Sequence, residues 1–373
     1  MPKKSREEQA IDLFSGVGGL SLGLHEAGWD VIEGFEIDQA AVDNYEINFP
    51  ASKVFHEDVK EINFSKYKGI GLIAGGPPCQ PFSVAGKMLS KNDPRDMVPQ
   101  FIRAVDEARP LAFLMENVPG LMTKRNFAYS EKIASDLSDL GYTVYVNKLT
   151  AYDYGVPQNR HRVFFVGFIE DIPYGFPTPT HGPDRKNAHL TSGEALKDVP
   201  EDEPNRAKIV YAQKPILRPS PFAGMLVNGQ GRPINLRGPS HTIPATAGGN
   251  RTHIYDPQGI LVEYHKHLMS GGKPEKGQVE GVRRITVRES VRIQSFPDDF
   301  QLISKRSARY RLIGNAVPPL LAKAVGESIY NALFRPSRLK NKVTLKGALT
   351  VTKNIFGNGI LEHIQFDNRS LPN

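Results

Sequence analysis

The chain is poor in cysteine: its 373 residues contain one, Cys79. A single thiol excludes an intramolecular disulfide and leaves too few thiolates for a zinc–thiolate cluster. The other potential ligands form no convincing cluster, so we expect no metal. No apolar run approaches the roughly 20 residues that a membrane-spanning helix needs, and the charged N-terminus lacks the apolar region of a signal peptide. We therefore expect a protein of the reducing cytoplasm with no membrane partner.

Acidic residues are in the minority, with 47 Lys and Arg against 40 Asp and Glu, for a net charge of +7. This excess permits a polyanionic partner without demanding one. It is concentrated in residues 281–312, where eight basic side chains stand against three acidic ones. Such a stretch is a better indication of nucleic-acid binding than the overall charge, although a charge run is more often a solvated face.

The pattern of the chain changes part-way along it. Residues 1–172 alternate short apolar runs with helix-like segments, which predicts an α/β domain. In residues 173–304 the alternation stops and glycine and proline become frequent, which predicts a smaller, irregular domain. A helix from Pro319, within residues 305–335, is expected to return to the first domain and complete it. The basic segment 336–373 has no role that we can assign.

Cys79 directly follows a short apolar run, residues 70–74, that predicts a buried strand. Two glycines and two prolines at 75–78 stop this strand and restrict the backbone that carries the thiol. The carboxyl end of a strand in an α/β sheet is the usual place for chemistry. A lone cysteine is more often a small buried hydrophobe, but these rigid, polar surroundings favour a nucleophile.

A second reactive group, Glu116, is predicted just past the carboxyl end of the strand-like run 111–115. A helix-capping or solvent-facing acid would have the same sequence, but two reactive groups at one sheet edge favour function. The long polar segment 83–100 between them is a candidate lid. Beyond it, Gln158, Arg160 and Arg162 alternate with other residues, which places them on one face of a predicted strand. An exposed strand face would show the same alternation.

A glycine-rich turn at 15–19 follows the strand-like run 11–14, and a second run ends at Glu36, 20 residues after Gly16. A strand, a glycine turn, a helix, a strand and then an acid is typical of nucleotide-type cofactor sites. The order Gly-Val-Gly-Gly displaces the third glycine that a dinucleotide site needs. The pattern therefore favours an adenosyl ligand without a diphosphate, although a glycine turn alone is a weak signal.

Taken together, these motifs resemble those of the DNA (cytosine-5-)-methyltransferase family of the bacterial restriction–modification type. The matching motifs, in that family's order, are residues 12–19, 77–80, 116–118, 158–162, 288–297 and 314–319. Six motifs in the right order are far more specific than any one of them. The resemblance covers about residues 11–169 and 283–330. It implies a Rossmann-like S-adenosylmethionine-dependent methyltransferase sheet, with a target recognition domain in the irregular region.

The resemblance also implies a reaction on double-stranded DNA. Cys79 would add to carbon 6 of a flipped-out cytosine, so that carbon 5 accepts a methyl group from S-adenosylmethionine. Glu116 would share a proton with ring nitrogen 3, and Arg160 and Arg162 would hold the base. We expect a monomer, and a cognate restriction endonuclease that acts separately.

The binding residues are carried over motif by motif. The resemblance implies that the cofactor contacts Phe14, Gly16, Val17, Gly18, Gly19, Leu20, Glu36, Ile37, Asp58, Val59, Pro78, Asn315 and Val317. The residues expected to contact DNA are Gln80, Ser83, Lys87 and Arg95 around the polar segment, and Gln230, Arg232, Arg237, Thr242, Gly248 and Gly249 in the recognition region. For this second group, ordinary surface turns are an almost equally good interpretation.

Three alternatives remain at this point. The first is a tRNA cytosine methyltransferase of the same lineage, which the long irregular region and the absence of a Cys-Phe-Thr motif disfavour. The second is a catalytically dead DNA-binding homologue, which should have lost Cys79, Glu116 or the glycine turn, and all three are intact. The third, a nicotinamide-dependent oxidoreductase, would explain the glycine turn but neither Cys79 nor Glu116.

Overall fold

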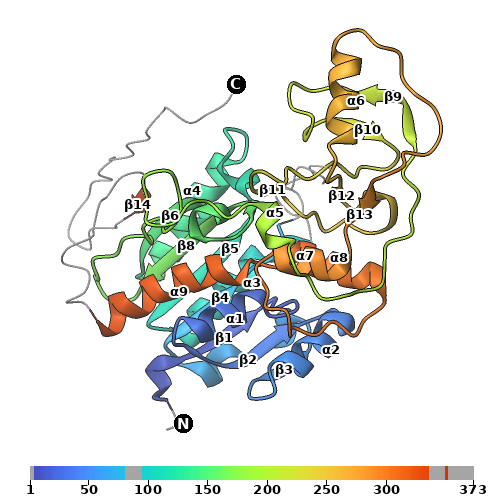
Figure 1. The fold of residues 1–373 in the computed structure, drawn as a ribbon. Helices are drawn as coiled ribbons and strands as arrows, with labels where there is room; N and C mark the ends of the chain where they lie inside the picture. The colour runs from blue at the N-terminus through green and yellow to red at the C-terminus, as the bar shows by residue number, and fades with distance from the viewer. Residues whose placement is uncertain (1–3, 80–94, 336–348, 352–373) are drawn as a thin grey trace.

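The structure is a computed structural model that describes residues 4–79, 95–335 and 349–351 (Figure 1). Within them, eight strands form one sheet in the order β14-β6-β8-β5-β4-β1-β2-β3. The strands β1 to β5 pair in parallel, and β8, β6 and β14 continue the sheet in antiparallel pairs. The bounds are β1 Gln9–Leu13, β2 Asp30–Glu36, β3 Lys53–His56, β4 Leu72–Gly75, β5 Ala112–Asn117, β6 Thr143–Thr150, β8 His161–Phe168 and β14 Leu349–Val351.

Helices cover both faces of this sheet, as the alternating burial of the strand residues requires. On one face, Ala10, Leu72 and Leu114 pack with the helices α1 and α9. On the other face, Ile11 and Ile73 pack with α3 and α4. The helices are α1 Gly19–Glu26, α2 Gln39–Asn48, α3 Val98–Ala108, α4 Phe127–Asp139, α5 Ser192–Ala195, α6 Ile260–Met269, α7 Val287–Ile293, α8 Arg306–Asn315 and α9 Pro319–Phe334. The predicted Rossmann-like α/β architecture is confirmed.

Short elements connect this framework and build the irregular region. The 3₁₀ turns are η1 Arg6–Glu8, η2 Val59–Glu61, η3 Phe64–Tyr67, η5 Pro119–Met122, η6 Ala151–Tyr154 and η7 Gly249–Arg251. The short strands are β7 Gln158–Asn159, β9 Tyr211–Ile216, β10 Met225–Val227, β11 Ser240–His241, β12 Ile254–Tyr255 and β13 Arg283–Arg284.

The helix α9 begins at Pro319, as expected, and packs against α1 although some 300 residues separate them. Small residues allow the close approach: a Cβ on Gly23 would lie 2.4 Å from the Cβ of Ala322. The indole Nε1 of Trp29 donates to the carbonyl of Gly326 at 3.1 Å. The last helix of the described chain is therefore part of the first domain's core.

The irregular region contains a lobe of β9, β10 and α6 that projects at the upper right of Figure 1. The lobe has a small core of its own, which includes Ile209, Leu226 and Leu261. Other parts of the region do not stand apart: Ile243 and Ile285 share a core with Val17, Ala41 and Tyr45 of the first domain.

The strand β3 ends at His56, and Asp58 then caps η2 by accepting a hydrogen bond from the Lys60 N–H at 3.0 Å. The structure corrects two predicted boundaries. Glu116 lies inside β5 and not beyond it, since β5 continues to Asn117 in its antiparallel pairing with β8. Residues 98–100, expected in the polar segment, begin α3, and the rest of the candidate lid up to residue 94 lies outside the described residues.

The described part of the basic tail adds an edge strand, with Leu349–Val351 paired antiparallel to residues 144–146 of β6. Among the residues that the structure describes, no helix is long and apolar enough to cross a membrane, and no group of three or more potential ligands could hold a metal ion.

Candidate active site

The predicted reactive residues gather at the point in the sheet where the order of the strands reverses. The strand β1 lies between β2 and β4, so the chain continues to one side of β1 through β2 and to the other side through β4. In open α/β sheets, ligands bind in the crevice outside the carboxyl ends of the strands at such a point. The glycine turn follows β1, Glu36 ends β2, Cys79 follows β4, and Glu116 lies near the end of β5.

The turn that carries Cys79 is held by the neighbouring strand. The amide Nδ2 of Asn117, the last residue of β5, donates to the carbonyl of Pro77 at 3.1 Å. Cys79 itself is 6% exposed. We assigned no role to Asn117 from the sequence, because nothing local to residues 116–118 shows which carbonyl its side chain meets.

Glu116 and Arg162 form an ion pair, with 2.5 Å between Oε1 of the acid and Nε of the guanidinium. Both side chains are nearly buried, at 11% and 12% exposed. Burial lowers the pKa of Arg162, and the Glu116 carboxylate opposes that shift. The other oxygen, Oε2, lies 3.2 Å from where a Cβ on Gly76 would be. The structure therefore brings Glu116 to the turn that leads to Cys79, with a cation behind it.

Arg160 has a different position from the one that we predicted for a base-holding residue. It is fully buried, and its guanidinium donates to the carbonyls of Ile243 at 3.2 Å and Gly314 at 2.9 Å, and to that of Ala316 at 3.0 Å. Burial lowers its pKa well below the ordinary value. The alternation that suggested a single strand is interrupted, because β7 ends at Asn159 and pairs with β11 instead.

Two glutamines extend the contacts of Arg160. Gln158 accepts from the N–H of Ile243 at 3.1 Å and donates to Oε1 of Gln294 at 2.7 Å. Gln294 in turn donates to the carbonyl of Ile313 at 2.6 Å. We call Gln158, Arg160 and Gln294 the polar clamp. It joins the recognition region and the C-terminal helices to the catalytic sheet.

We predict that Arg160→Ala lowers the free energy of unfolding by at least about 3 kcal/mol, because it leaves several buried carbonyls without a donor. Arg160→Lys should recover only part of the loss, since one ammonium cannot reach carbonyls that a planar guanidinium bridges. Urea unfolding measures both variants. The exposed Arg237 provides the control, for which Arg237→Ala should cost less than about 0.5 kcal/mol. If Arg160→Ala lowers the free energy of unfolding as little as the control does, the polar clamp does not stabilise the fold as described.

The Glu36 carboxylate accepts main-chain hydrogen bonds, one of which comes from the glycine turn. Oε2 of Glu36 accepts from the N–H of Gly16 at 2.9 Å, and Oε1 accepts from Ile37 at 2.9 Å and Asp38 at 2.8 Å. Gly16 has a φ of +55°, and a Cβ there would have no atom within 4 Å. The backbone of the turn is therefore open on this side.

The other two glycines of the turn are needed for packing. A Cβ on Gly18, whose φ is +88°, would lie 2.2 Å from the Phe49 ring, and a Cβ on Gly19 would lie 2.3 Å from the carbonyl of Val317. A side chain at either position would displace a neighbour. Gly19 therefore holds the turn against the motif at residues 314–319.

The remaining predicted cofactor residues fall into two groups. Ile37 is 64% exposed, and Pro78 and Asn315 are exposed as well, so these side chains are free to contact a ligand. Phe14 and Asp58 are half-buried, and Asp58 already caps η2. The buried side chains, which pack in the protein's cores, are Val17, Leu20, Val59 and Val317.

A comparison with known proteins agrees with this site. The family model described as C-5 cytosine-specific DNA methylase matches residues 9–331. The chain belongs to this family. It is a DNA (cytosine-5-)-methyltransferase.

Several relatives of this methylase match over most of its length. It is 32% identical to the type II methyltransferase M.FnuDI of Fusobacterium nucleatum, over 90% of this chain and 98% of the relative. It is 35% identical to the type II methyltransferase M.NgoMIV of Neisseria gonorrhoeae, over 87% and 97%. A solved structure of a proposed DNA modification methyltransferase encoded within an E. coli prophage is 27% identical, with a TM-score of 0.62, over 87% of this chain and 99% of that one.

The basic stretch of the methylase serves mainly to join its own segments. Its ion pairs, in chain order, are Arg283 with Glu289, Arg292 with Asp298, Arg306 and Arg309 with Glu203, and Arg311 with Asp38. Arg284 is buried and donates to the carbonyl of Thr252 at 2.8 Å. Much of the charge that suggested a nucleic-acid surface is therefore paired within the protein, with Glu289 and Asp298 inside the stretch and with Glu203 and Asp38 outside it.

Some of the predicted DNA-contacting residues lie together. A Cβ on Gly229 would lie 1.9 Å from the carbonyl of Asn250, so the turn that carries Gln230 sits against the turn of Gly248 and Gly249. Gln230 and Gly249 are exposed there.

The other predicted DNA-contacting residues are placed separately. Arg237 is exposed on a turn that α5 holds, with the Ser192 N–H donating to the Gly238 carbonyl at 2.8 Å. The Thr242 hydroxyl donates to the carbonyl of Asn159 at 2.9 Å. Arg232 is half-buried, and its charge acts on the paired imidazoles at 241 and 253. Arg95 is described, whereas Gln80, Ser83 and Lys87 lie outside the described residues.

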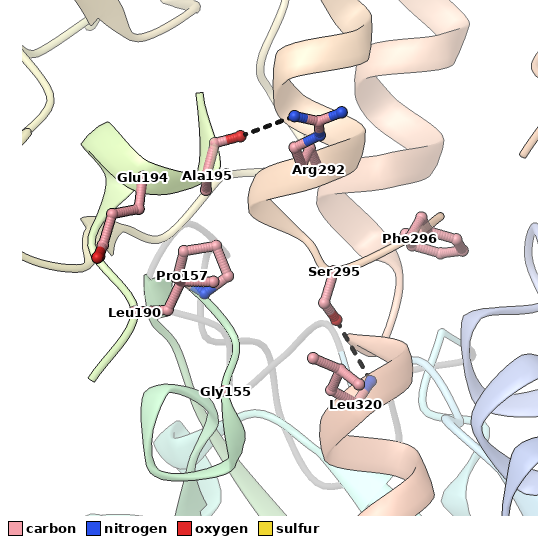
Figure 2. A pocket seen from close by; sticks show the side chains of 9 residues that line it. All are labelled: Gly155, Pro157, Leu190, Glu194, Ala195, Arg292, Ser295, Phe296 and Leu320. Carbon is pink, nitrogen blue, oxygen red and sulfur yellow. Dashed lines mark hydrogen bonds between the residues drawn. The ribbon is translucent and has the colours of Figure 1, made fainter. Parts of the chain in front are cut away.

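A cavity of about 300 Å³ lies where the catalytic sheet meets the recognition region (Figure 2). Its lining residues are Gly155, Pro157, Leu190, Glu194, Ala195, Arg292, Ser295, Phe296 and Leu320. Its polar groups already have partners: Arg292 donates to the carbonyl of Ala195 at 3.4 Å, and Oγ of Ser295 accepts from the Leu320 N–H at 3.3 Å (Figure 2). Neither Cys79 nor Glu116 lines this cavity, and we assign it no part in the reaction.

Below the glycine turn, Asp12 of β1 is fully buried and accepts a hydrogen bond from Oγ of Ser21 at 2.6 Å. Burial raises its pKa from 3.8 to about 7, the Ser21 hydroxyl opposes the shift, and the charge of Glu36 adds to it. Between pH 4 and 7 the folded protein therefore binds more protons at Asp12 than the unfolded chain does. Stability from this group falls as the pH rises through that window.

We predict that Asp12→Asn flattens the fall in stability between pH 4 and 7. The contribution removed is about 4 kcal/mol at most, because each pKa unit corresponds to about 1.4 kcal/mol. Urea-unfolding midpoints at pH 4, 5, 6 and 7 measure it, with the exposed Glu46→Gln as the control. If wild type and Asp12→Asn lose the same stability as the pH rises, the pKa of Asp12 is not raised in the folded protein.

Proposed function

We propose that this methylase transfers a methyl group to carbon 5 of one cytosine within a short sequence of double-stranded DNA. The observation that carries the proposal is the convergence of Cys79 with the Glu116–Arg162 pair at the carboxyl ends of β4 and β5. The family match gives the base and the position of the methyl group on it.

Carbon 5 of cytosine is a poor nucleophile, and the role of Cys79 is to change that. Addition of the Cys79 thiolate to carbon 6 converts the ring to an enamine, whose carbon 5 can attack an electrophilic methyl group. After transfer, the proton on carbon 5 leaves and the bond to Cys79 breaks. The rigid turn at 75–78, held by Asn117, keeps the sulfur in one place through both steps.

The Glu116–Arg162 pair suits the charge that the addition creates. Electron density builds at ring nitrogen 3, and a carboxyl that shares a proton with this atom stabilises the adduct. Arg162 fixes the orientation of Glu116 and has further N–H groups for the base. Arg160 acts indirectly, since the polar clamp holds the strand that leads to Arg162.

The turn at 15–19 and its neighbours fit S-adenosylmethionine. The fit rests on the open side of Gly16, the fixed carboxylate of Glu36 and the exposed apolar side chain of Ile37. Main-chain groups of the turn and Glu36 would hold the ribose side, and Ile37, Pro78 and Asn315 would hold the remainder. When bound, S-adenosylmethionine supplies the methyl group as a sulfonium.

A stacked cytosine cannot reach a nearly buried thiol, so the base must leave the duplex. The cost of flipping is a few kcal/mol, which contacts to the extruded base and the DNA backbone offset. Gln230 and the turn at 248–249 are exposed side by side and suit a role at the DNA. Because the relatives are named type II methyltransferases, we also propose that the enzyme is the protective half of a restriction–modification system.

The test is transfer of labelled methyl groups from S-adenosylmethionine to duplex DNA, with base-resolution mapping of the product. We expect label on carbon 5 of cytosine in one short sequence. Methylated DNA should then resist an endonuclease that cuts that sequence. Label on tRNA and none on DNA would show that the enzyme methylates RNA. No label on either would favour a catalytically dead DNA-binding protein.

A further inference from the structure

Asp96 lies beside Cys79, although 17 residues separate the two in the sequence. Their main chains pair as an antiparallel β-bridge. The N–H of Met97 donates to the carbonyl of Pro78 at 3.0 Å, which fixes the same pairing from the next residue. The segment that leads into α3 is therefore anchored to the turn of the nucleophile.

Two donors hold the carboxylate of Asp96 in place. The phenol of Tyr129, on α4, donates to Oδ2, and the N–H of Val98, at the start of α3, donates to Oδ1 at 3.1 Å. Burial raises the pKa of Tyr129, and the Asp96 carboxylate raises it further, so the phenol keeps its proton and stays a donor.

The charge on Asp96 acts on the thiol of Cys79. Burial raises the pKa of Cys79, and the Asp96 carboxylate raises it further, so both disfavour the thiolate. Among the described residues, Glu116 pairs with Arg162, and Arg95 has an interaction of its own. Within this part of the chain, Asp96 is the negative charge that acts most directly on the nucleophile.

We propose that Asp96 is a positioning residue that keeps Cys79 in its thiol form in the DNA-free enzyme. A thiolate attacks available electrophiles, whereas a thiol does not. The proposed methyl donor is such an electrophile, and it would bind in the same crevice. Holding the sulfur protonated until a base arrives protects the nucleophile from a useless, irreversible methylation. The inference rests on the proposed role of Cys79, but its test needs no DNA.

Because Cys79 is the only cysteine of the chain, thiol alkylation reports on this residue alone. Iodoacetamide forms a carbon–sulfur bond, releases iodide and leaves the thiol proton with the solvent. The rates are measured between pH 7 and 10 for wild type, Asp96→Asn and Asp96→Glu. Asp106→Asn is the control, since Asp106 is an exposed carboxylate on α3.

We expect Asp96→Asn to be alkylated about threefold faster than wild type wherever the thiol is mostly protonated. Removal of a nearby like charge lowers a thiol pKa by about one unit, which gives about ten times more thiolate. The intrinsic reactivity of that thiolate falls about threefold, because nucleophilicity decreases with pKa. The rate of Asp96→Glu should remain near that of wild type, since it keeps the charge.

Two results would overturn the proposal. The first is an Asp96→Asn rate that equals that of wild type or of Asp106→Asn. The second is equal acceleration in Asp96→Asn and Asp96→Glu, because a loosened β-bridge, and not the lost charge, would then explain it. The proposed function is judged separately: methyl transfer to DNA tests it, and alkylation of the free enzyme does not depend on that outcome.

Discussion

Cys79→Ala is expected to reduce methyl transfer to DNA by on the order of 10⁴-fold or more, because no other thiol can activate carbon 6. The fold should survive, since the change removes one sulfur from a small, nearly buried side chain. Single-turnover transfer from labelled S-adenosylmethionine measures the loss. DNA affinity, measured in parallel, should stay within about tenfold of wild type, because the recognition region is unchanged.

Covalent trapping tests the role of Cys79 as the nucleophile in a second, independent way. In DNA that carries 5-fluorocytosine at the target, the fluorine cannot leave as a proton does, so the bond between Cys79 and carbon 6 persists after transfer. Wild type should form a complex that survives denaturation, and Cys79→Ala should not. A trapped complex with Cys79→Ala, or substantial transfer by this variant, would show that another group is the nucleophile.

Glu116→Gln is expected to lower methyl transfer by about 10² to 10⁴-fold, the usual range for loss of a group that moves a proton. The amide keeps the shape of the carboxyl but cannot share its proton with ring nitrogen 3. The change also leaves the nearly buried Arg162 without its anion, which destabilises the fold by about 3–5 kcal/mol. Single-turnover transfer and urea unfolding measure the two effects separately.

A double variant tests whether lost stability alone explains the loss of transfer in Glu116→Gln. Glu116→Gln combined with Arg162→Met removes the unpaired cation, so stability should return towards that of wild type while transfer stays low. The exposed Glu131, on α4, is the matched control, and Glu131→Gln should leave both quantities unchanged. If transfer recovers along with stability in the double variant, the loss in Glu116→Gln came from misfolding and not from proton transfer.

The sequence predicts those parts of the site that a few neighbouring residues determine. The turn at 15–19 and the turn before Cys79 follow from local chemistry, because glycine and proline decide where a strand stops. Glu36 follows from a spacing within one strand–helix–strand unit. The helix from Pro319 follows from its own apolar periodicity. Each of these elements can form from its own sequence.

Contacts between distant segments were out of reach of the sequence. Nothing near Arg160 shows that its guanidinium meets the carbonyls of Ile243 and Gly314, and regular alternation suggested an open strand face instead. The proposed role of Asp96 is equally hard to predict from the sequence, because it depends on a β-bridge to Cys79. Two acids that pair with arginines of the basic stretch, Glu203 and Asp38, lie far away in the chain, so these ion pairs could not be predicted from it.

The hydrogen bonds between the polar clamp and the recognition region have a consequence for how the sequences of such enzymes can change. The clamp contacts the N–H and carbonyl of Ile243, which every residue type except proline carries. These hydrogen bonds therefore persist when Ile243 is exchanged for another apolar residue that fits the core shared with Val17 and Tyr45. If the irregular region reads the DNA sequence, as proposed, variants of that region could keep this main-chain attachment to the catalytic domain.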